Sequence, residues 1–385
     1  MTYFGFFLCL FWLTQAWTMV TFLRHYKLTD KCKNLPALTS YPKLSIIVTA
    51  RDEAEKIAQC LTSLVNLSYP DLEIIAVNDR SRDATGQIMD KLAADNPRIR
   101  VLHIETLPEG WLGKVHAMHT AGQIATGEFF LFTDGDVIYE TPALEQAMRY
   151  VTAQQLSHLC LIPHFLSGTL WENALVNFFG MTFIMSLCPQ AINSNNSKFY
   201  AGVGAFNLVS KNAYQQLGGH QLLRLEIIDD MRLGRLIKQH GFASHLLLAD
   251  DLLSLKWHST VKGVIKGIEK NAFAALDYSI AKLLLLTVVF KLLVFSPYLA
   301  LFFLQGFDCL GFVLALLVMH SVYGYCCEKL HAGGWKITWT LPIAAMLTLL
   351  AMWNSAVVTL WQGGVKWRDT FYALEMLKTQ KWKNN

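Results

Sequence analysis

One short stretch, an apolar run that ends in two acids, restricts the possible folds of this chain more than any other. Phe129–Phe132 leads through Thr133 into Asp134-Gly135-Asp136. The run predicts a short strand buried on both faces, as in a parallel sheet. The strand would hold both acids at the carboxyl edge of the sheet, where α/β proteins bind ligands. Two acids so close repel each other unless a hard cation lies between them. The stretch therefore predicts a Mg²⁺ or Mn²⁺ site, with an ordinary Asp-Gly hairpin turn as the alternative.

The sequence from Leu44 to Asp250 alternates short apolar runs with amphipathic stretches. Six runs predict strands: Leu44–Thr49, Glu73–Asn78, Ile99–Ile104, Phe129–Thr133, Leu156–Ile162 and His245–Ala249. Five stretches between them predict helices, near residues 53–66, 83–95, 114–126, 141–154 and 229–240. This alternation predicts βαβ units and an α/β fold with a mostly parallel sheet covered by helices on both faces.

The composition of the whole chain is that of a membrane protein. Hydrophobic residues make up 53% of the 385 residues and charged residues only 16%, and the mean hydropathy is +0.31. This balance is unusual for a soluble domain. The formal net charge of +4 is too small to indicate nucleic-acid binding. Eight cysteines without metal-type spacing predict free thiols in a reducing cytosol.

Four hydrophobic blocks are close to the length that spans a bilayer. They are residues 3–22, 283–304, 310–327 and 337–361. The first block lacks a cleavage site, and basic residues follow it, so it predicts a retained anchor with the next domain in the cytoplasm. Lys291 interrupts the second block, which could be tilted or partly interfacial. Four crossings would leave the basic tail outside, against the charge rule, so we expect that one block does not cross.

Further acids follow the other predicted strands or begin predicted helices. Glu53 follows the first strand and Asp79 ends the second, where acids contact riboses in nucleotide-binding folds. Helix starts and polar loops explain both equally well. Lys114 begins a helix against the dipole, which suggests a nearby anion, although a solvated lysine is the commoner explanation. Asp229 and Asp230 begin another helix, either as a solvated pair or with one acid as a general base.

Two other motifs have weaker interpretations. His116 and His119 lie three residues apart on one helical face without a third ligand, which favours packing over metal binding. The glycine-rich stretch Phe199–Asn207 lacks the following helix of a phosphate loop. We interpret it as a flexible wall near the acceptor.

The acids together, in this order along the chain, resemble family 2 glycosyltransferases with the A-type fold. The resemblance covers residues 42–275 and rests on Glu53, Asp79, Asp134-Gly135-Asp136 and the pair Asp229-Asp230. It implies a Rossmann-like nucleotide-binding half, with transmembrane helices before and after it. By this resemblance Asp79 would hold the uracil or ribose of a nucleotide sugar, with Glu53 and the backbone of Thr49 and Ala50 beside it.

The same resemblance implies roles for the remaining site residues. Asp136, and less directly Asp134, would bind the divalent cation on the diphosphate, and Asp230, beside Asp229, would be the base on the acceptor hydroxyl. Lys114 matches a lysine often found in membrane-bound, lipid-directed members. The hydrophobic blocks and Trp367-Arg368 also resemble the lipid-glycosylating branch, near ceramide, hopanoid-associated and carotenoid-acid glycosyltransferases.

One stretch departs from the pattern of processive family members. These carry Gln-x-x-Arg-Trp on a helix at the membrane surface, whereas this chain has Trp257-His258-Ser259 followed by lysines spaced by four. Lys262, Lys266 and Lys270 would line one helical face. We expect most of them to contact anionic lipid head groups, with Lys270 as a candidate for the leaving diphosphate.

The sequence thus predicts an inverting, metal-dependent hexosyltransferase of the cell membrane, multi-pass, with a cytoplasmic catalytic domain. Its donor would be a nucleotide sugar, with a UDP-sugar expected, and its acceptor a hydroxyl or carboxyl of a membrane lipid. The alternatives are a processive polysaccharide synthase and a non-catalytic membrane protein that keeps the fold. The expected domains are an anchor (1–23), a catalytic domain (42–255), a basic interfacial segment (256–282), a transmembrane region (283–361) and a basic tail (362–385).

Overall fold

The computed structural model describes residues 2–166, 168–194, 196, 198–257, 260–330 and 333–379. The chain divides into two compact units, which we describe separately. The sheet unit comprises His25–His164 and Pro189–Lys256, and the helical unit comprises Met1–Arg24, Phe165–Cys188 and Trp257–Asn385.

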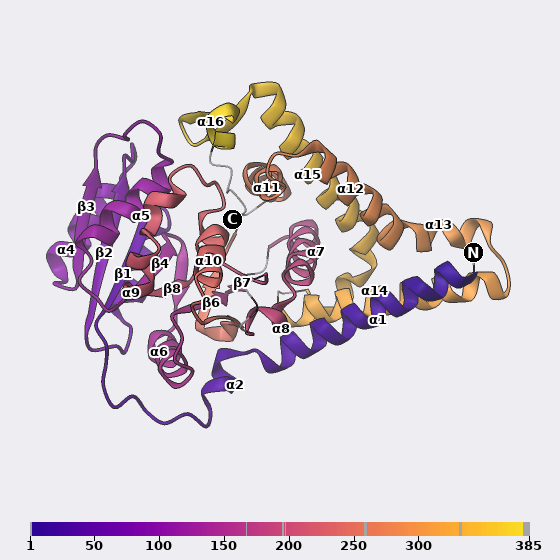
Figure 1. Cartoon of the computed structure of the whole chain (residues 1–385), viewed down its shortest axis with the longest axis horizontal. Helices are drawn as coiled ribbons and strands as arrows, with labels where there is room; N and C mark the ends of the chain where they lie inside the picture. The colour runs from indigo at the N-terminus through magenta and orange to yellow at the C-terminus, as the bar shows by residue number, and fades with distance from the viewer. Residues whose placement is uncertain are drawn as a thin grey trace. The chain divides into compact units, whose positions relative to one another are not determined.

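A seven-stranded sheet organises the sheet unit (Figure 1). Its strands, in spatial order, are β3 (Ile99–Ile104), β2 (Leu72–Asp79), β1 (Leu44–Ala50), β4 (Phe129–Asp134), β8 (Asn207–Ser210), β6 (His158–Ile162) and β9 (Ser244–Leu248). All pairs are parallel except those of β8, which runs antiparallel to β4 and β6. The predicted mostly parallel α/β sheet is confirmed, and all six predicted strands are present within two residues of the expected ends.

The strand β1 forms the apolar centre of this sheet. All seven of its residues are buried, because it pairs with β2 on one side and β4 on the other. In this register Thr49 lies opposite both Val77 and Asp134. The carboxyl ends of β1, β2 and β4 therefore meet at one edge, as the sequence predicted.

Helices flank the sheet, and short elements complete the unit. They are α2 (Leu28–Cys32), α3 (Ile57–Val65), α4 (Thr85–Asp95), α5 (Gly113–Ile124), α6 (Ala143–Ala153), α8 (Pro189–Ile192), α9 (Lys211–Gln216), η1 (Gly219–Leu223), α10 (Asp229–Gln239) and η2 (Asp250–Leu252). A second, three-stranded sheet has the order β5 (Val137–Tyr139), β10 (Leu253–Leu255) and β7 (His164–Phe165), and β5 and β10 are antiparallel.

Helix α3 begins four residues later than the predicted start at residue 53. The backbone N–H groups that an earlier start would use are tied to the loop after β2 instead. The Glu53 N–H donates to Thr85 Oγ1 at 2.8 Å, and the Ala54 N–H donates to Asp83 Oδ2 at 3.0 Å. These bonds join the loops that follow β1 and β2, which fixes the edge where both strands end.

The helical unit contains the apolar helices. They are α1 (Thr2–His25), α7 (Leu170–Leu187), α11 (Val261–Ala275), α12 (Ile280–Phe290), the π-helix η3 (Lys291–Phe295), α13 (Ser296–Phe303), α14 (Phe307–Lys329), η4 (Gly334–Thr340) and α15 (Leu341–Gln362). A hairpin of β11 (Gly364–Trp367) and β12 (Thr370–Ala373) follows, and then α16 (Leu374–Thr379).

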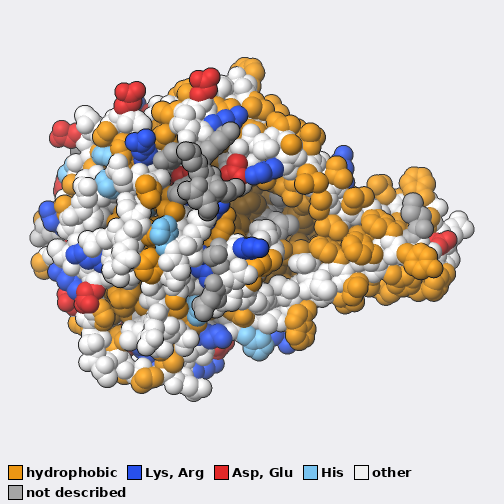
Figure 2. Space-filling model, viewed as in Figure 1, with side chains coloured by type: hydrophobic (Ala, Val, Ile, Leu, Met, Phe, Trp, Pro, Cys, Tyr) orange, Lys and Arg blue, Asp and Glu red, His pale blue; other side chains and the backbone are white. Residues whose placement is uncertain are grey.

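Four helical stretches of this unit are long and apolar enough to cross a membrane. They are Thr2–His25, Ile280–Phe303, Phe307–Lys329 and Gly334–Gln362, and they contain the four predicted blocks. Large apolar side chains stay exposed on them, such as Phe302 at 82% and Phe307 at 68%. In Figure 2, hydrophobic side chains gather over this part of the chain. Exposed apolar surface of this extent indicates a lipid environment.

The second of these stretches passes through Lys291 by way of a π-turn. Pro297 has no N–H to give to the Leu293 carbonyl four residues earlier, and the indole Nε1 of Trp12 donates to that carbonyl at 3.0 Å. Helices α1 and α14 approach closely where Gly5 meets Gly311, since any side chain there would clash with the facing backbone. Proline and glycine positions thus decide how these helices pack.

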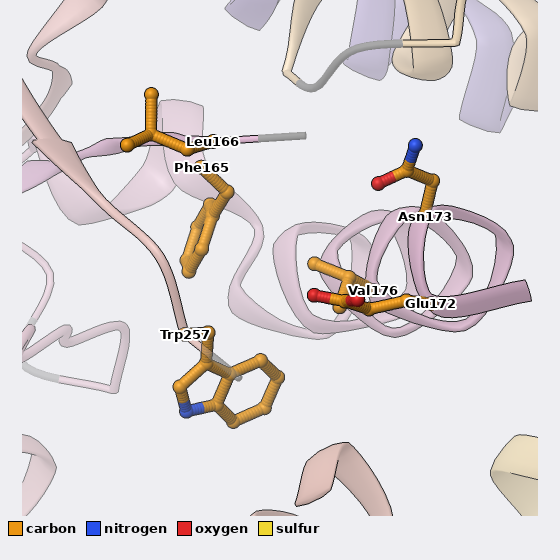
Figure 3. Close-up of a pocket in the computed structure, with 6 residues that line it drawn as sticks. All are labelled: Phe165, Leu166, Glu172, Asn173, Val176 and Trp257. Carbon is orange, nitrogen blue, oxygen red and sulfur yellow. The ribbon is translucent and has the colours of Figure 1, made fainter. Parts of the chain in front are cut away.

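A small pocket of the helical unit lies between Phe165, Trp257 and the first turn of α7 (Figure 3). Its two polar side chains already serve the turn that leads into this helix. Glu172 accepts from the Thr169 N–H at 3.3 Å, and Asn173 Oδ1 accepts from the Gly168 N–H at 2.8 Å. The polar groups of this pocket are therefore accounted for by helix capping.

Candidate active site

A pocket of the sheet unit is lined by the two acids that begin α10. We call it the acid pocket; its lining residues are Lys114, Met118, Phe132, Thr133, Gly204, Asn207, His220, Asp229 and Asp230. They come from β4, α5, β8 and the segment before it, η1 and α10, so residues up to 116 positions apart meet here. Three of the residues that sequence patterns singled out separately, Lys114, Asp229 and Asp230, share one cavity.

Lys114 neutralises the acids of this pocket. Its Nζ lies 2.6 Å from Asp134 Oδ1, and its side chain is 21% exposed. Burial by itself would lower the pKa of Lys114, but the charges of Asp134, Asp229 and Asp230 outweigh burial and raise it. The position of Lys114 at the start of α5 suggested a nearby anion. The carboxylates of Asp134, Asp229 and Asp230 are these anions.

Gly204 lies at the centre of the charged groups. A methyl group at Gly204 would lie 2.9 Å from Asp134 Oδ2 and 3.5 Å from both Asp230 Oδ2 and Lys114 Nζ. A methyl group at Gly202 would clash with the backbone of Asp230. The glycine-rich stretch that we interpreted as a flexible wall is packed against the acids, because a side chain at Gly202 or Gly204 would come too close to Asp230 or Asp134.

Asp230 is held in the first turn of α10. Its Oδ1 accepts from the Met231 N–H at 2.7 Å. Burial raises the pKa of Asp230, and the charge of Asp134 raises it further, whereas the Lys114 charge and the backbone N–H groups oppose the rise. A carboxylate with a raised pKa beside a cavity has the properties of a general base. Asp229, beside it, is 5% exposed.

Asp136 lies two residues beyond Asp134 and has a lysine of its own. Lys56 Nζ, from the turn before α3, is 3.0 Å from Asp136 Oδ2. Burial raises the pKa of Asp136, and the nearby charge of Asp134 adds to the rise. This repulsion is what a bound cation would relieve. Gly135 lies between the acids, and a methyl group there would lie 3.0 Å from Ala50 Cβ.

Asp79 ends β2 and pairs with its neighbour in sequence. Arg80 has a left-handed φ of 57°, which folds its side chain back so that Nε lies 2.7 Å from Asp79 Oδ1 and Nη2 lies 3.1 Å from Oδ2. Any side chain at Gly113 would clash with this pair. The pair therefore lies against the start of α5, one residue before Lys114.

The residues predicted beside Asp79 lie at the ends of the neighbouring strand. Thr49 and Ala50 end β1, with Ala50 opposite Asn78, and Glu53 follows in the loop that bonds to Thr85. The structure thus brings the ends of β1 and β2 together, with Glu53 in the adjoining loop.

Lys270 belongs to the helical unit and contacts an aromatic ring there. Its Nζ lies 3.8 Å from the centroid of the Trp367 ring, a cation–π contact. The predicted role of Lys270 at the diphosphate stays a prediction. His258 and Ser259, in the stretch compared with Gln-x-x-Arg-Trp, lie outside the described residues.

The residues at the end of β4 fit a divalent cation. Within the described ranges, no group of three or more His, Cys, Asp or Glu could hold a metal by itself. Mg²⁺ needs fewer, because it is commonly held by one or two carboxylates together with phosphate oxygens and water. Asp134 and Asp136 supply two carboxylates, and burial, with the charge of Asp134 second, raises the pKa of Asp136, so a cation there would stabilise its ionised form.

Three residues of this region were not foreseen from the sequence. Lys56 and Arg80 each pair with one of the predicted acids, and His220 lines the acid pocket. The glycine pair Gly218-Gly219 before His220 was the available signal, because both have positive φ values, of 73° and 58°, that fix the following turn.

Comparison with known proteins identifies the family of the sheet unit. Residues 45–218 match the family model described as "Glycosyl transferase family 2". The chain contains a family 2 glycosyltransferase domain. This match covers β1, β2 and β4 and the segment before β8, so it includes every acid discussed above except Asp229 and Asp230.

One curated relative and one solved structure extend the comparison. A 4,4'-diaponeurosporenoate glycosyltransferase of Staphylococcus aureus is 25% identical over 225 residues, which is 58% of this chain and 57% of the relative. The chain therefore aligns with little more than half the length of that relative. The mannosyltransferase PcManGT from Pyrobaculum calidifontis, solved in complex with GDP-Man and Mn²⁺, is similar with a TM-score of 0.52 and 16% identity, over 93% of this chain and 99% of that chain. This likeness confirms the expected A-type glycosyltransferase fold.

Proposed function

We propose that this family 2 glycosyltransferase domain moves a sugar from a nucleotide-sugar donor to a hydroxyl or carboxyl of a membrane lipid, with inversion at the anomeric carbon. The observation that carries the proposal is the position of Gly204, within 3.5 Å of Asp134, Asp230 and Lys114 when measured from the site of its missing methyl group. A half-buried lysine and two acids around one glycine, at the carboxyl edge of a mostly parallel sheet, suit the transfer of a group from an anionic donor.

The donor would lie along the ends of β1, β2 and β4. Asp79, with Glu53 and the backbone of Thr49 and Ala50, would contact the nucleoside, and we expect a UDP-sugar. Asp136 and Asp134 would hold Mg²⁺ or Mn²⁺, which stabilises the negative charge that grows on the departing diphosphate.

Lysines would assist the departure of the diphosphate. Lys114 and Lys56 each touch one of the two acids of β4, and either ammonium group can turn to a phosphate oxygen while staying close to its carboxylate. In a partly buried site such a positive charge stabilises a developing anion strongly.

Asp230 would accept the proton of the acceptor hydroxyl as this oxygen attacks the anomeric carbon from the face opposite the diphosphate. Its raised pKa makes it a stronger base than a free aspartate, and the charge of Lys114 opposes the rise. Asp229 would support its orientation. If the acceptor is a carboxylate, no proton is removed, and Asp230 only orients the acceptor.

The lipid nature of the acceptor is supported by the four helical stretches that are long and apolar enough to span a membrane. It is also supported by the relative whose printed name denotes transfer to a diaponeurosporenoate. Basic residues end α1 (Arg24 and His25) and follow it (Lys27, Lys31 and Lys33). By the positive-inside rule, we propose a multi-pass protein of the cell membrane with the sheet unit in the cytoplasm.

The proposal is tested with membranes that contain the protein and a panel of labelled nucleotide sugars. We expect one of these sugars to appear in an extracted lipid, whose mass increases by one hexose. The Asp230→Asn variant should lose transfer to a hydroxyl acceptor by about 100-fold or more while it binds the donor normally.

Asp95→Asn, a change of an exposed acid on α4, is the matched control and should transfer at the wild-type rate. Wild-type protein that binds nucleotide but labels no lipid with any sugar of the panel would support the non-catalytic alternative and refute the proposal.

A further inference from the structure

His220 is a buried histidine on the wall of the acid pocket. It lies in η1, directly after Gly218-Gly219, and is 1% exposed. Its ring packs edge-on against Phe132 of β4, with 4.5 Å between the ring centroids. The pocket that contains Asp229, Asp230 and Lys114 is therefore bounded on one side by an imidazole ring.

Tyr214 determines which nitrogen of His220 carries the hydrogen. The Tyr214 hydroxyl accepts from the His220 backbone N–H at 3.2 Å and lies 2.8 Å from His220 Nδ1. This buried hydroxyl has one hydrogen to donate, and Nδ1 is the acceptor in reach among the described residues. If Nδ1 carried a hydrogen, the Tyr214 hydrogen would be left buried without an acceptor, which is costly. The hydroxyl therefore donates to Nδ1, and the ring hydrogen is on Nε2.

The ring stays neutral across the working pH range. Burial lowers the pKa of His220 to about 3, and the nearby positive charges of His119 and Lys114 contribute to the decrease. Its Nε2–H is thus a permanent donor without positive charge. Among the described residues no acceptor contacts this N–H, although the ring lines the acid pocket. An N–H that has no protein acceptor, on a residue that lines a pocket, is available to a hydrogen-bond acceptor of a bound molecule.

The composition of the pocket indicates what that acceptor is. Lys114 already supplies the positive charge that an anionic phosphate would require. A neutral N–H beside the carboxylates of Asp229 and Asp230 suits a group that accepts one hydrogen bond and donates another. A sugar hydroxyl does both, because its oxygen can accept from Nε2–H while its hydrogen is donated to a carboxylate.

We propose that His220 is a specificity-determining residue that donates its Nε2–H to one hydroxyl oxygen of the sugar being transferred. This inference rests on the proposed glycosyltransferase function, and it adds one defined hydrogen bond between this chain and the donor sugar. Sites that hydrogen-bond a substrate hydroxyl discriminate strongly against analogues that lack it.

The test compares His220→Phe, which keeps a ring of similar shape without the donor, with His220→Gln, whose amide can replace Nε2–H. The substrates are the nucleotide sugar found active in the labelling assay and its monodeoxy derivatives, each lacking one hydroxyl of the sugar. For wild-type protein, one derivative should have kcat/KM lowered about tenfold or more. His220→Phe should lower kcat/KM for the parent sugar by a similar factor and leave that one derivative unaffected, while His220→Gln should recover part of the loss.

The outcomes separate this inference from the proposed function. If no nucleotide sugar is transferred by wild-type protein, the function itself is wrong. If transfer occurs but His220→Phe lowers kcat/KM equally for the parent and every deoxy derivative, the hydroxyl contact is wrong. If His220→Phe does not fold, as judged by its thermal transition, His220→Gln decides alone. It should then discriminate between the parent and the one derivative less than wild type does, and unchanged discrimination would overturn the inference.

Discussion

The most direct test of the acid pocket adds one methyl group at Gly204. Gly204→Ala places a carbon 2.9 Å from Asp134 Oδ2 and 3.5 Å from Asp230 Oδ2 and Lys114 Nζ. The last two distances are ordinary van der Waals contacts, and the first requires a shift of only a few tenths of an ångström at the end of a side chain. The φ angle of Gly204 is not in the left-handed region, so alanine fits the backbone without strain.

The expected effects on folding and on catalysis are therefore different. Replacing glycine by alanine at a compatible position stabilises a protein by about 0.4–1 kcal/mol through the unfolded chain, which offsets the tight contact with Asp134. We expect the thermal transition to stay within about 4 °C of wild type. The methyl group fills the space between the acids and the lysine, and a displacement of reacting groups by about 1 Å costs about 100-fold in rate. We expect kcat/KM to fall by about that factor or more.

The assays are thermal unfolding in detergent and transfer of labelled sugar by the same preparation. Gly202→Ala is the contrasting variant, because its methyl group would clash with the backbone of Asp230 and should destabilise the fold itself. Wild-type activity in folded Gly204→Ala would refute the assignment of this space to the reacting groups. Loss of folding in Gly204→Ala would refute the packing described for the glycine-rich segment.

Three further predictions concern charge. Lys114→Met removes the positive charge that favours ionised Asp230. Lys114 Nζ and Asp230 Oδ2 each lie 3.5 Å from the site of the missing methyl group of Gly204, and an attraction over roughly 7 Å at an effective dielectric constant of about 20 is about 2 kcal/mol. Activity falls at acidic pH as Asp230 is protonated, and in Lys114→Met this fall should occur about one to two pH units higher than in wild type. Lys114→Arg, which keeps the charge, should leave the pH–rate profile unchanged. An unchanged profile in Lys114→Met would contradict the electrostatic coupling between Lys114 and Asp230. Excess chelator should abolish transfer and Mn²⁺ or Mg²⁺ should restore it, and full activity in chelator would rule out the cation at Asp134 and Asp136. Burial favours the neutral form of Glu73, but hydrogen bonds from Ser45 and Thr126 outweigh burial and lower its pKa. Ionised Glu73 therefore stabilises the folded protein above the unfolded-state pKa, and this stabilisation is lost as the pH falls through the folded-state pKa. The free energy of unfolding of Glu73→Gln, measured in urea, should depend less on pH in the acidic range than that of wild type. An identical pH dependence would show that Glu73 does not contribute to stability.

The strands of the sheet could be predicted because their residues alone require burial. Runs such as Phe129–Phe132 are apolar at every position, and only the centre of a sheet covered on both faces hides such a run. Strand β8 was not predicted, because Asn207–Ser210 has only two apolar residues, and its place between β4 and β6 comes from pairing with them. The start of α3 was misplaced for a similar reason, since the Glu53 N–H is taken by Thr85 of a distant loop.

The acids of the candidate site could be found from the sequence because each follows a strand or begins a helix. Strand ends in a parallel sheet converge at one edge whatever the details of packing, and Asp134 does lie opposite Thr49. Their partners could not be found in this way. Lys56 contacts Asp136, which is 80 positions away in the chain. The donor role of His220 can be inferred only from the hydroxyl of Tyr214, which lies 2.8 Å from its Nδ1.

The order of residues along the chain determined the strands, the apolar helices and the edge where the acids gather, because burial of apolar side chains and the direction of strands are properties that local sequence already contains. Only the tertiary structure decided which cation faces which acid, where Gly204 leaves open space and which hydrogen the imidazole of His220 carries. These depend on distances between side chains that are far apart in sequence, and the energy of a charge or a hydrogen bond changes within a few ångströms.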